Sequence, residues 1–255
     1  RNVLALYDSE DNSEAISGSN GQQRNVVLYD RTLYKDGAWN TLCLPFDVVL
    51  ANSPLAGATA KTVIGTTTSG NDLTINFGNP DSATEPVTVL KAGVPYIIKW
   101  DATNTNIVEP VFTGVTVVSS TEADRTVSVL DGDVKFVGYY DALSLDPAGS
   151  DDFAANVVPS IYYMTADNTL KHTGKARTLR ACRAYFQFAD EAAQQAREIR
   201  LDFGGDETTE ILSTTNFTNY TNEAGAWYTV DGVKLNGKPT RKGLYIFNGH
   251  KVVIK

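Results

Sequence analysis

The segment WNTLCLPF, residues Trp39–Phe46, contains no charged side chain. In an extended chain successive side chains point to opposite faces, so the segment presents two separate sets of residues. One face carries Leu42, Leu44 and Phe46, and the other carries Trp39, Thr41 and Cys43. Both faces are largely apolar, which is typical of a strand with packed layers on both sides. We therefore predict a central, buried strand here, with the rest of the fold built around it.

Short stretches rich in Val, Ile, Tyr, Phe and Thr recur along the chain, separated by clusters of Gly, Asn, Asp and Pro. The predicted strands are 25–29, 40–49, 73–77, 87–90, 95–100, 111–118, 126–130, 134–140, 160–164, 181–188 and 198–203. Residues 189–199, ADEAAQQAREI, have a helix-forming composition, and a loop is the alternative there. Strands at this density, without helical periods between them, predict an all-β fold of the antiparallel β-sandwich type.

The chain is predicted to divide near FGGDETTEI, 203–211, where two glycines and an acidic run follow a strand. We predict a β-sandwich domain over 1–205 and a small C-terminal β module over 206–255, with 206–222 as its connector. The expected strands of the module are 227–235, 243–247 and 251–254. The Asn-Gly pair at 248–249 predicts a tight hairpin between the last two.

Net charge argues against a nucleic-acid partner, and hydropathy argues against a membrane-spanning segment. The chain of 255 residues carries a formal net charge of −8, which argues against a nucleic-acid backbone. Its longest apolar runs have the length of strands and fall far short of the roughly 20 residues of a membrane-spanning helix. We predict no membrane span.

Six ordered motifs carry a resemblance to a known family. They are RTLYKDGAWNTLCLPFDV, SPLAGATAKTV, LKAGVPYIIKW, PVFTGVTV, VKFVGYYDALSL and RACRAYFQF, and they lie within residues 30–205. This part of the chain resembles a β-rich module of secreted and surface proteins of Bacteroidetes, including large proteins with BspA-like leucine-rich repeats. The C-terminal residues are similar to type IX secretion sorting domains at Tyr228, Gly232, Gly243, Tyr245 and Lys251.

The resemblance implies export and a location that is secreted or at the cell surface. On that basis we expect that an export signal preceded Arg1 and was removed. The resemblance also implies a role in adhesion or in building a larger surface protein, and it supplies neither catalytic residues nor a cofactor. We therefore predict a non-catalytic module, not an enzyme, whose partners are other domains or proteins at the cell surface, or glycans.

The two cysteines are Cys43 and Cys182. A catalytic thiol needs a base nearby and an electropositive setting, and the stretch around Cys43 contains no histidine. Cys182 alternates with Ala184, Phe186 and Phe188, so it too is predicted to face the core. If the two strands are neighbours, a Cys43–Cys182 disulfide can form after export. Two buried free thiols are the alternative.

Acidic residues gather in two predicted loops, DSEDNSE at 8–14 and DPAGSDD at 146–152. Calcium is bound by the oxygen atoms of such loops, and Asp146, Asp151 and Asp152 are the candidate ligands. Neither loop has the spacing of an EF-hand, and a solvated acidic turn is the alternative. A glycoside hydrolase, the third function considered, would need two carboxylates facing each other across a cleft.

Aromatic side chains are candidates for stacking on sugar rings. Consecutive residues of a strand point to opposite faces, so one tyrosine of each pair, Tyr139/Tyr140 and Tyr162/Tyr163, is predicted to point outward. The candidates for stacking are Tyr139, Tyr162 and Trp227, and core packing is the alternative. These residues make a carbohydrate-binding module the second predicted function.

Basic residues are concentrated at 171–183, KHTGKARTLRACR. The segment contains Lys171, Lys175, Arg177, Arg180 and Arg183. In a chain of negative net charge, this concentration predicts either contact with an acidic glycan or partner, or an ordinary solvated loop.

Overall fold

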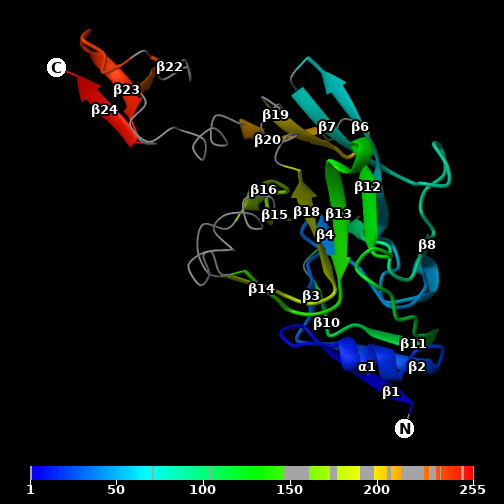
Figure 1. The fold of residues 1–255 in the computed structure, drawn as a ribbon. Coiled ribbons are helices and arrows are strands. Elements are labelled where there is room, and N and C mark those ends of the chain that lie inside the picture. Colours follow the sequence, from blue (N-terminus) through cyan, green and yellow to red (C-terminus); the bar gives the residue numbers. More distant parts are fainter. Residues whose placement is uncertain are drawn as a thin grey trace.

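The computed structural model describes residues 2–70, 72–103, 105–145, 161–172, 177–189, 198–205, 208–213, 227–229, 234–235, 237–247 and 250–254. Strands dominate this part of the chain (Figure 1), which confirms the all-β prediction. The helical elements within it are α1 (Ser13–Gly18) and the 3-10 turns η1 (Leu50–Asn52) and η2 (Leu130–Gly132).

Two sheets pack face to face as a β-sandwich. The first has the strand order β20-β19-β7-β6-β9-β4, and the second has the order β12-β13-β18-β15-β16. The first sheet contains β4 (Asn40–Leu42), β6 (Thr59–Ser69), β7 (Asp72–Gly78), β9 (Tyr96–Lys99), β19 (Glu198–Asp202) and β20 (Thr208–Ser213). The second contains β12 (Thr126–Val129), β13 (Val134–Tyr139), β15 (Ile161–Met164), β16 (Leu170–His172) and β18 (Arg183–Phe188).

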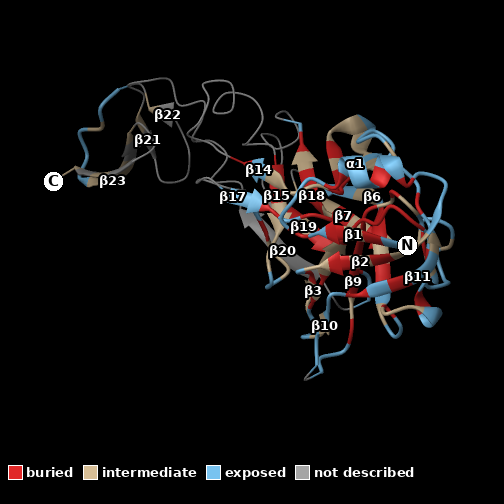
Figure 2. Cartoon of the chain, turned by 90° about the horizontal axis from the view of Figure 1, so that it is seen from below, coloured by how far each residue is buried: buried red, intermediate tan, exposed pale blue. Residues whose placement is uncertain are grey.

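The core between these two sheets is built around phenylalanines. Phe136 of β13 and Phe186 of β18 stack with their ring centroids 4.6 Å apart. Phe77, from the opposite sheet, meets both rings edge-on at about 6 Å. Each strand contributes one apolar face to this sandwich core because its side chains alternate. The buried residues drawn in red in Figure 2 therefore follow the strands of the body.

A third sheet packs against the other side of β4 and β9. It has the order β1-β2-β11 and contains β1 (Val3–Tyr7), β2 (Gln23–Tyr29) and β11 (Val111–Thr116). Its inward residues and Ile16 of α1 form a second core together with Leu42 and Ile98. The neighbouring Ile97 belongs to the sandwich core, so β9 has packed layers on both of its faces.

Two strand pairs are parallel, which differs from the prediction of a purely antiparallel sandwich. β1 pairs in parallel with β2, and β19 pairs in parallel with β7. Parallel neighbours need a crossover connection, and the segment with α1 supplies one between β1 and β2. Side-chain alternation is the same in both kinds of pair, so the pattern of residues did not distinguish them.

The segment Trp39–Phe46 lies between the two cores, but only part of it is a strand. β4 ends at Leu42, and the Cys43 N–H donates to the Cys182 carbonyl oxygen at 3.3 Å instead of continuing the ladder to β9. Pro45, which has no N–H, follows two residues later. Trp39 joins the sandwich core, whereas the second core contains Leu42, Cys43, Leu44 and Phe46. The prediction that Cys43 shares the face of Trp39 is therefore wrong, because the alternation of an extended strand stops at Leu42. The prediction of burial is confirmed, and the prediction of a strand over the whole segment is wrong.

Three two-stranded pairs complete the body. They are β3 (Thr32–Leu33) with β10 (Ile107–Val108), β5 (Val48–Val49) with β8 (Val89–Leu90), and β14 (Leu143–Leu145) with β17 (Arg177–Leu179). The β14–β17 pair and the loop after it place Arg177 and Arg180 beside the second sheet of the sandwich, whose own strands β16 and β18 carry Lys171 and Arg183.

The C-terminal residues form a four-stranded sheet with the order β22-β21-β23-β24. Its strands are β21 (Trp227–Thr229), β22 (Lys234–Leu235), β23 (Gly243–Phe247) and β24 (His250–Ile254). The predicted strand 227–235 is therefore a hairpin, because β21 and β22 pair with each other.

In the predicted connector, Thr208–Ser213 is strand β20 and pairs with β19. Of the predicted helix 189–199, residues 190–197 lie outside the described residues, and 198–199 belong to β19.

Candidate functional site

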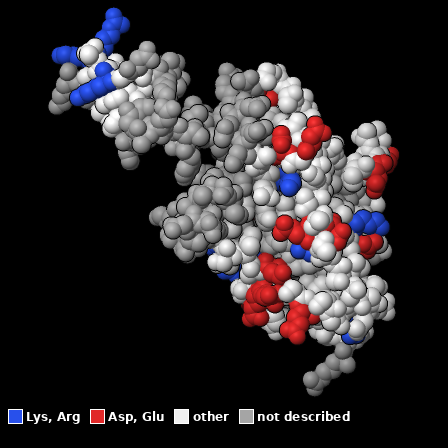
Figure 3. Space-filling model, in the orientation of Figure 1, with Lys and Arg blue, Asp and Glu red and all other residues white. Residues whose placement is uncertain are grey.

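The structure brings four of the five basic residues of 171–183 together around one open pocket, which we call the basic pocket; the fifth, Lys175, lies outside the described residues. Its volume is about 510 Å³, and four of its lining residues are cations: Lys171, Arg177, Arg180 and Arg183. Tyr139, Tyr163 and Thr41 also line it. No carboxylate lines it within the described part of the chain. On the face of the body drawn in Figure 3, by contrast, Asp and Glu side chains are widespread.

Three of the four cations lie near a tyrosine, and strand pairing accounts for two of them. Lys171 of β16 is opposite Tyr163 of β15, and Arg183 of β18 is opposite Tyr139 of β13. Arg177, at the start of β17, places its guanidinium over the Tyr163 ring, 4.4 Å from the centroid. Paired residues of an antiparallel sheet lie side by side on one face, so these groups all point into the same pocket. The basic run was predicted from the sequence, whereas its proximity to Tyr139 and Tyr163 was not.

A buried carboxylate anchors the inner wall of the basic pocket. Asp8, at the end of β1, has a side chain that is only 3% exposed, and it forms ion pairs with three arginines. Arg183 binds both of its carboxylate oxygens, with an Nη2–Oδ2 distance of 3.3 Å. Arg180 lies 3.4 Å and Arg31 lies 3.9 Å from it. The interpretation of Asp8 as part of a solvated acidic turn is therefore wrong, because these arginines enclose it.

Arg31 is a buried positive charge behind the basic pocket. Its Nη2 donates to the carbonyl oxygen of the pocket residue Thr41 at 2.9 Å. Its Nε and Nη1 have no hydrogen-bond partner among the described residues. Burial, and next the charge of Arg183, lower the pKa of Arg31 to about 9, while Asp8 acts to raise it. Arg31 therefore stays charged at neutral pH, and three guanidinium groups share one carboxylate.

The tyrosines predicted for stacking are not the ones that are accessible. Tyr162 is 1% exposed and packs edge-on against Phe188, and Tyr139 is 9% exposed and packs against Tyr185. The partly exposed member of the second pair is Tyr163. The prediction that Tyr162 and Tyr163 point to opposite faces of β15 is confirmed. The choice of Tyr162 as the outward residue is wrong, because its face belongs to the sandwich core.

The remaining sequence candidates lie elsewhere. Trp227 is half-buried in the C-terminal sheet and stacks on Phe247, its cross-strand partner, with centroids 4.5 Å apart. The calcium candidates Asp146, Asp151 and Asp152 lie outside the described residues. Among the residues that are described, no group of three or more His, Cys, Asp or Glu side chains is arranged to hold a metal ion.

Cys43 and Cys182 are neighbours in the second core, and both are buried free thiols. The structure therefore corresponds to the free-thiol alternative and not to the disulfide. Cys43 packs its sulfur against Gly138 of β13, and the Cys182 sulfur faces the Tyr140 carbonyl oxygen at 3.9 Å. Burial raises the pKa of the Cys182 thiol to about 12 and also raises the pKa of the Cys43 thiol.

We expect both thiols to be unreactive in the folded protein, because the thiolate is the reactive form. Labelling with a thiol reagent at pH 8 should be at least about 100-fold slower than in denaturant. Denaturant without a reducing agent should then release two reactive thiols. Rapid labelling of the folded chain would contradict the burial, and no thiol in denaturant would mean that a disulfide is present after all.

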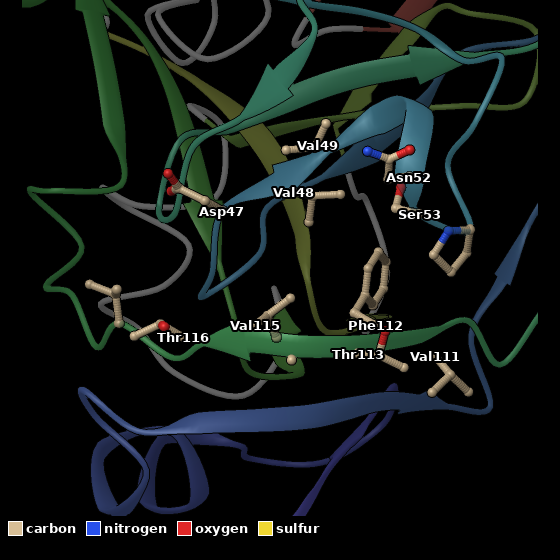
Figure 4. A pocket seen from close by; sticks show the side chains of 13 residues that line it. Asp47, Val48, Val49, Asn52, Ser53, Val111, Phe112, Thr113, Val115 and Thr116 are labelled. Carbon is tan, nitrogen blue, oxygen red and sulfur yellow. The ribbon is translucent and has the colours of Figure 1, made fainter.

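A second cavity, of about 570 Å³, lies between β5 and β11. Figure 4 shows the Phe112 and Val115 side chains directed from β11 toward β5, where Val48 faces them. Phe112 and Val48 are buried, and the polar groups lie at the margin, including Asn52, Ser53 and Asp47. The Asp47 carboxylate is occupied by Lys91 at 3.0 Å and by the Ala92 N–H at 2.8 Å. This groove thus has an apolar floor, and its one carboxylate is already engaged.

The outer face of the β1–β2–β11 sheet carries exposed apolar residues that the sequence analysis missed. Tyr7 and Tyr29 stack there with centroids 5.3 Å apart, and Val27 lies opposite Val111. Tyr7 is 39% and Val111 46% exposed. The alternation of residues along β1 could have predicted this outer face. Leu4 and Leu6 point inward and are buried, so Tyr7 points outward.

No protein-family model, curated protein or solved structure matches this chain. Within the described residues, no helix has the length and apolar character needed to cross a membrane. Guanidinium, ammonium and phenol groups around an open pocket can bind an anion and pack against a ring.

Proposed function

We propose that this chain is a non-catalytic binding module of a secreted, surface-exposed bacterial protein, with a role in adhesion or in contacts between surface components. The observation that supports this proposal is the basic pocket, an open site whose lining side chains suit recognition of an anionic partner. The resemblance to modules of Bacteroidetes surface proteins supports the location.

A carbohydrate-binding module is the second candidate function. It is favoured by the partly exposed Tyr163, which lies in the basic pocket next to cations that can contact polar groups of a sugar. Aromatic side chains combine a large apolar surface with a polar end, which suits the mixed surface of a saccharide. Under this reading the adhesion partner is a glycan and not a protein.

The proposal is tested by coating beads with the full chain and measuring their retention under flow on mucin, on an epithelial-cell layer and on bare glass. We expect retention on at least one biological surface, well above that of beads coated with an unrelated β-sandwich protein of similar charge. The released fluid is assayed for new reducing ends, which a glycoside hydrolase would produce. Equal retention of both bead types, or the appearance of reducing ends, would overturn the proposal.

A further inference from the structure

The basic pocket concentrates positive charge in a chain that is acidic as a whole. Four cationic side chains line it, whereas the formal net charge of the chain is −8. Asp167, in the turn before β16, interacts electrostatically with Lys171 but is not among the lining residues. The charge of the lining therefore stays positive, while the negative net charge of the chain as a whole disfavours long polyanions.

The charged groups that lie behind the basic pocket also carry a net positive charge. Asp8 is shared by Arg31, Arg180 and Arg183, so these four groups together carry an excess of positive charge. Arg31 is 3% exposed, and its Nε and Nη1 have no hydrogen-bond partner among the described residues. A buried charge that is only partly compensated is costly, and an anion bound in front of it reduces that cost.

The arrangement of the cations favours a planar or branched oxyanion attached to a ring. A guanidinium presents parallel N–H groups that match two oxygens of a carboxylate or a sulfate. Arg177 lies flat over Tyr163, and Lys171 is opposite the same tyrosine, so charge and aromatic surface are adjacent. The volume of about 510 Å³ lies within the roughly 300–1,000 Å³ typical of small-ligand pockets.

We infer that the basic pocket binds an acidic saccharide unit, with its carboxylate or sulfate group between Arg177, Lys171 and Arg183 and its ring beside Tyr163. The inference deepens the proposed function and rests on it, because it names the class of partner that the module recognises. Arg183 is held in place by Asp8, so it forms the fixed side of the site, while Lys171 and Arg177 form the exposed side.

The test is isothermal titration of the full chain with three oligosaccharides of equal length. One carries carboxylates only, as in alternating glucuronate and N-acetylglucosamine, one carries sulfate esters only, and one is neutral maltohexaose. We expect at least one acidic oligosaccharide to bind and the neutral one not to bind. Comparison of the first two identifies whether the carboxylate or the sulfate is the preferred group.

Two double variants, each of which loses two positive charges, distinguish binding in the basic pocket from non-specific attraction between the chain and an anion. Lys171→Gln with Arg177→Gln removes two charges from the pocket and should weaken binding about tenfold or more. Arg24→Gln with Lys91→Gln removes two positive charges that lie outside the pocket and should change affinity less than about twofold. Circular dichroism checks that all four substitutions leave the fold intact.

Equal weakening in both variants, equal binding of the neutral oligosaccharide, or no binding at all would overturn the inference. The bead assay distinguishes this failure from failure of the proposed function. Beads that are retained on a biological surface although no acidic oligosaccharide binds would leave the adhesion proposal standing and remove the saccharide from it.

Discussion

Replacing Asp8 with asparagine is expected to lower the free energy of unfolding by about 3–5 kcal/mol, the cost of removing one partner from a buried ion pair. Asp8 and Arg31 are each 3% exposed in their side chains, and water cannot replace the lost carboxylate without opening the structure. Arg183 loses one of its two acceptor oxygens and the negative charge in the same step, because the asparagine amide keeps a single oxygen and places an NH2 donor against the guanidinium. Urea unfolding followed by the fluorescence of the buried Trp39 and Trp100 measures the change.

The control is the same substitution at an exposed ion pair. Asp47 and Lys91 are 55% and 58% exposed, and Asp47→Asn should cost no more than about 1 kcal/mol. If Asp8→Asn proved as mild as Asp47→Asn, the three arginines would not depend on Asp8, and the account of the fixed side of the basic pocket would be wrong.

Substitution of Gly138 by alanine is the second large effect, with an expected loss of about 3 kcal/mol from overpacking. Gly138 lies in β13, where an added Cβ would collide with the Sγ of Cys43 and come within 2.9 Å of its Cβ. The carbonyl oxygen of Arg125 lies at 3.4 Å on another side, so the strand has little room to move away. Urea unfolding is again the measurement.

The collision can be relieved by a second substitution at Cys43. Removing the sulfur by Cys43→Ala in the Gly138→Ala background should restore most of the lost stability, because the new methyl group then occupies the vacated space. Gly65→Ala in β6, where an added Cβ meets nothing within 4 Å, is the control and should change stability by less than about 1 kcal/mol. Failure of the double variant to recover stability would show that Cys43 is not the obstacle.

Local sequence was enough to predict the class of fold and the burial of its centre. Residues such as Phe136, Phe186 and Phe77 lie in strands whose alternation marks one apolar face, and that alternation is a property of the extended backbone itself. The two apolar faces of Trp39–Phe46 predicted two packed layers, and the structure has a core on each side of it. The parallel pairs were missed because alternation does not encode strand direction. Helix α1 was missed because its six residues are too few to show a helical period.

The candidate site depended on tertiary structure for a different reason. The sequence divides Tyr162 and Tyr163 into opposite faces, yet only the position of the neighbouring sheet decides that Tyr162 is inside and Tyr163 borders the basic pocket. Asp8 meets Arg180 and Arg183 across 172 and 175 residues of chain, and no local pattern relates positions so far apart. Composition and alternation thus determined an acidic all-β protein with a concentrated basic segment. Long-range strand pairing decided that this segment encloses one pocket, because only the folded sheets bring its cations, its tyrosines and the buried carboxylate together.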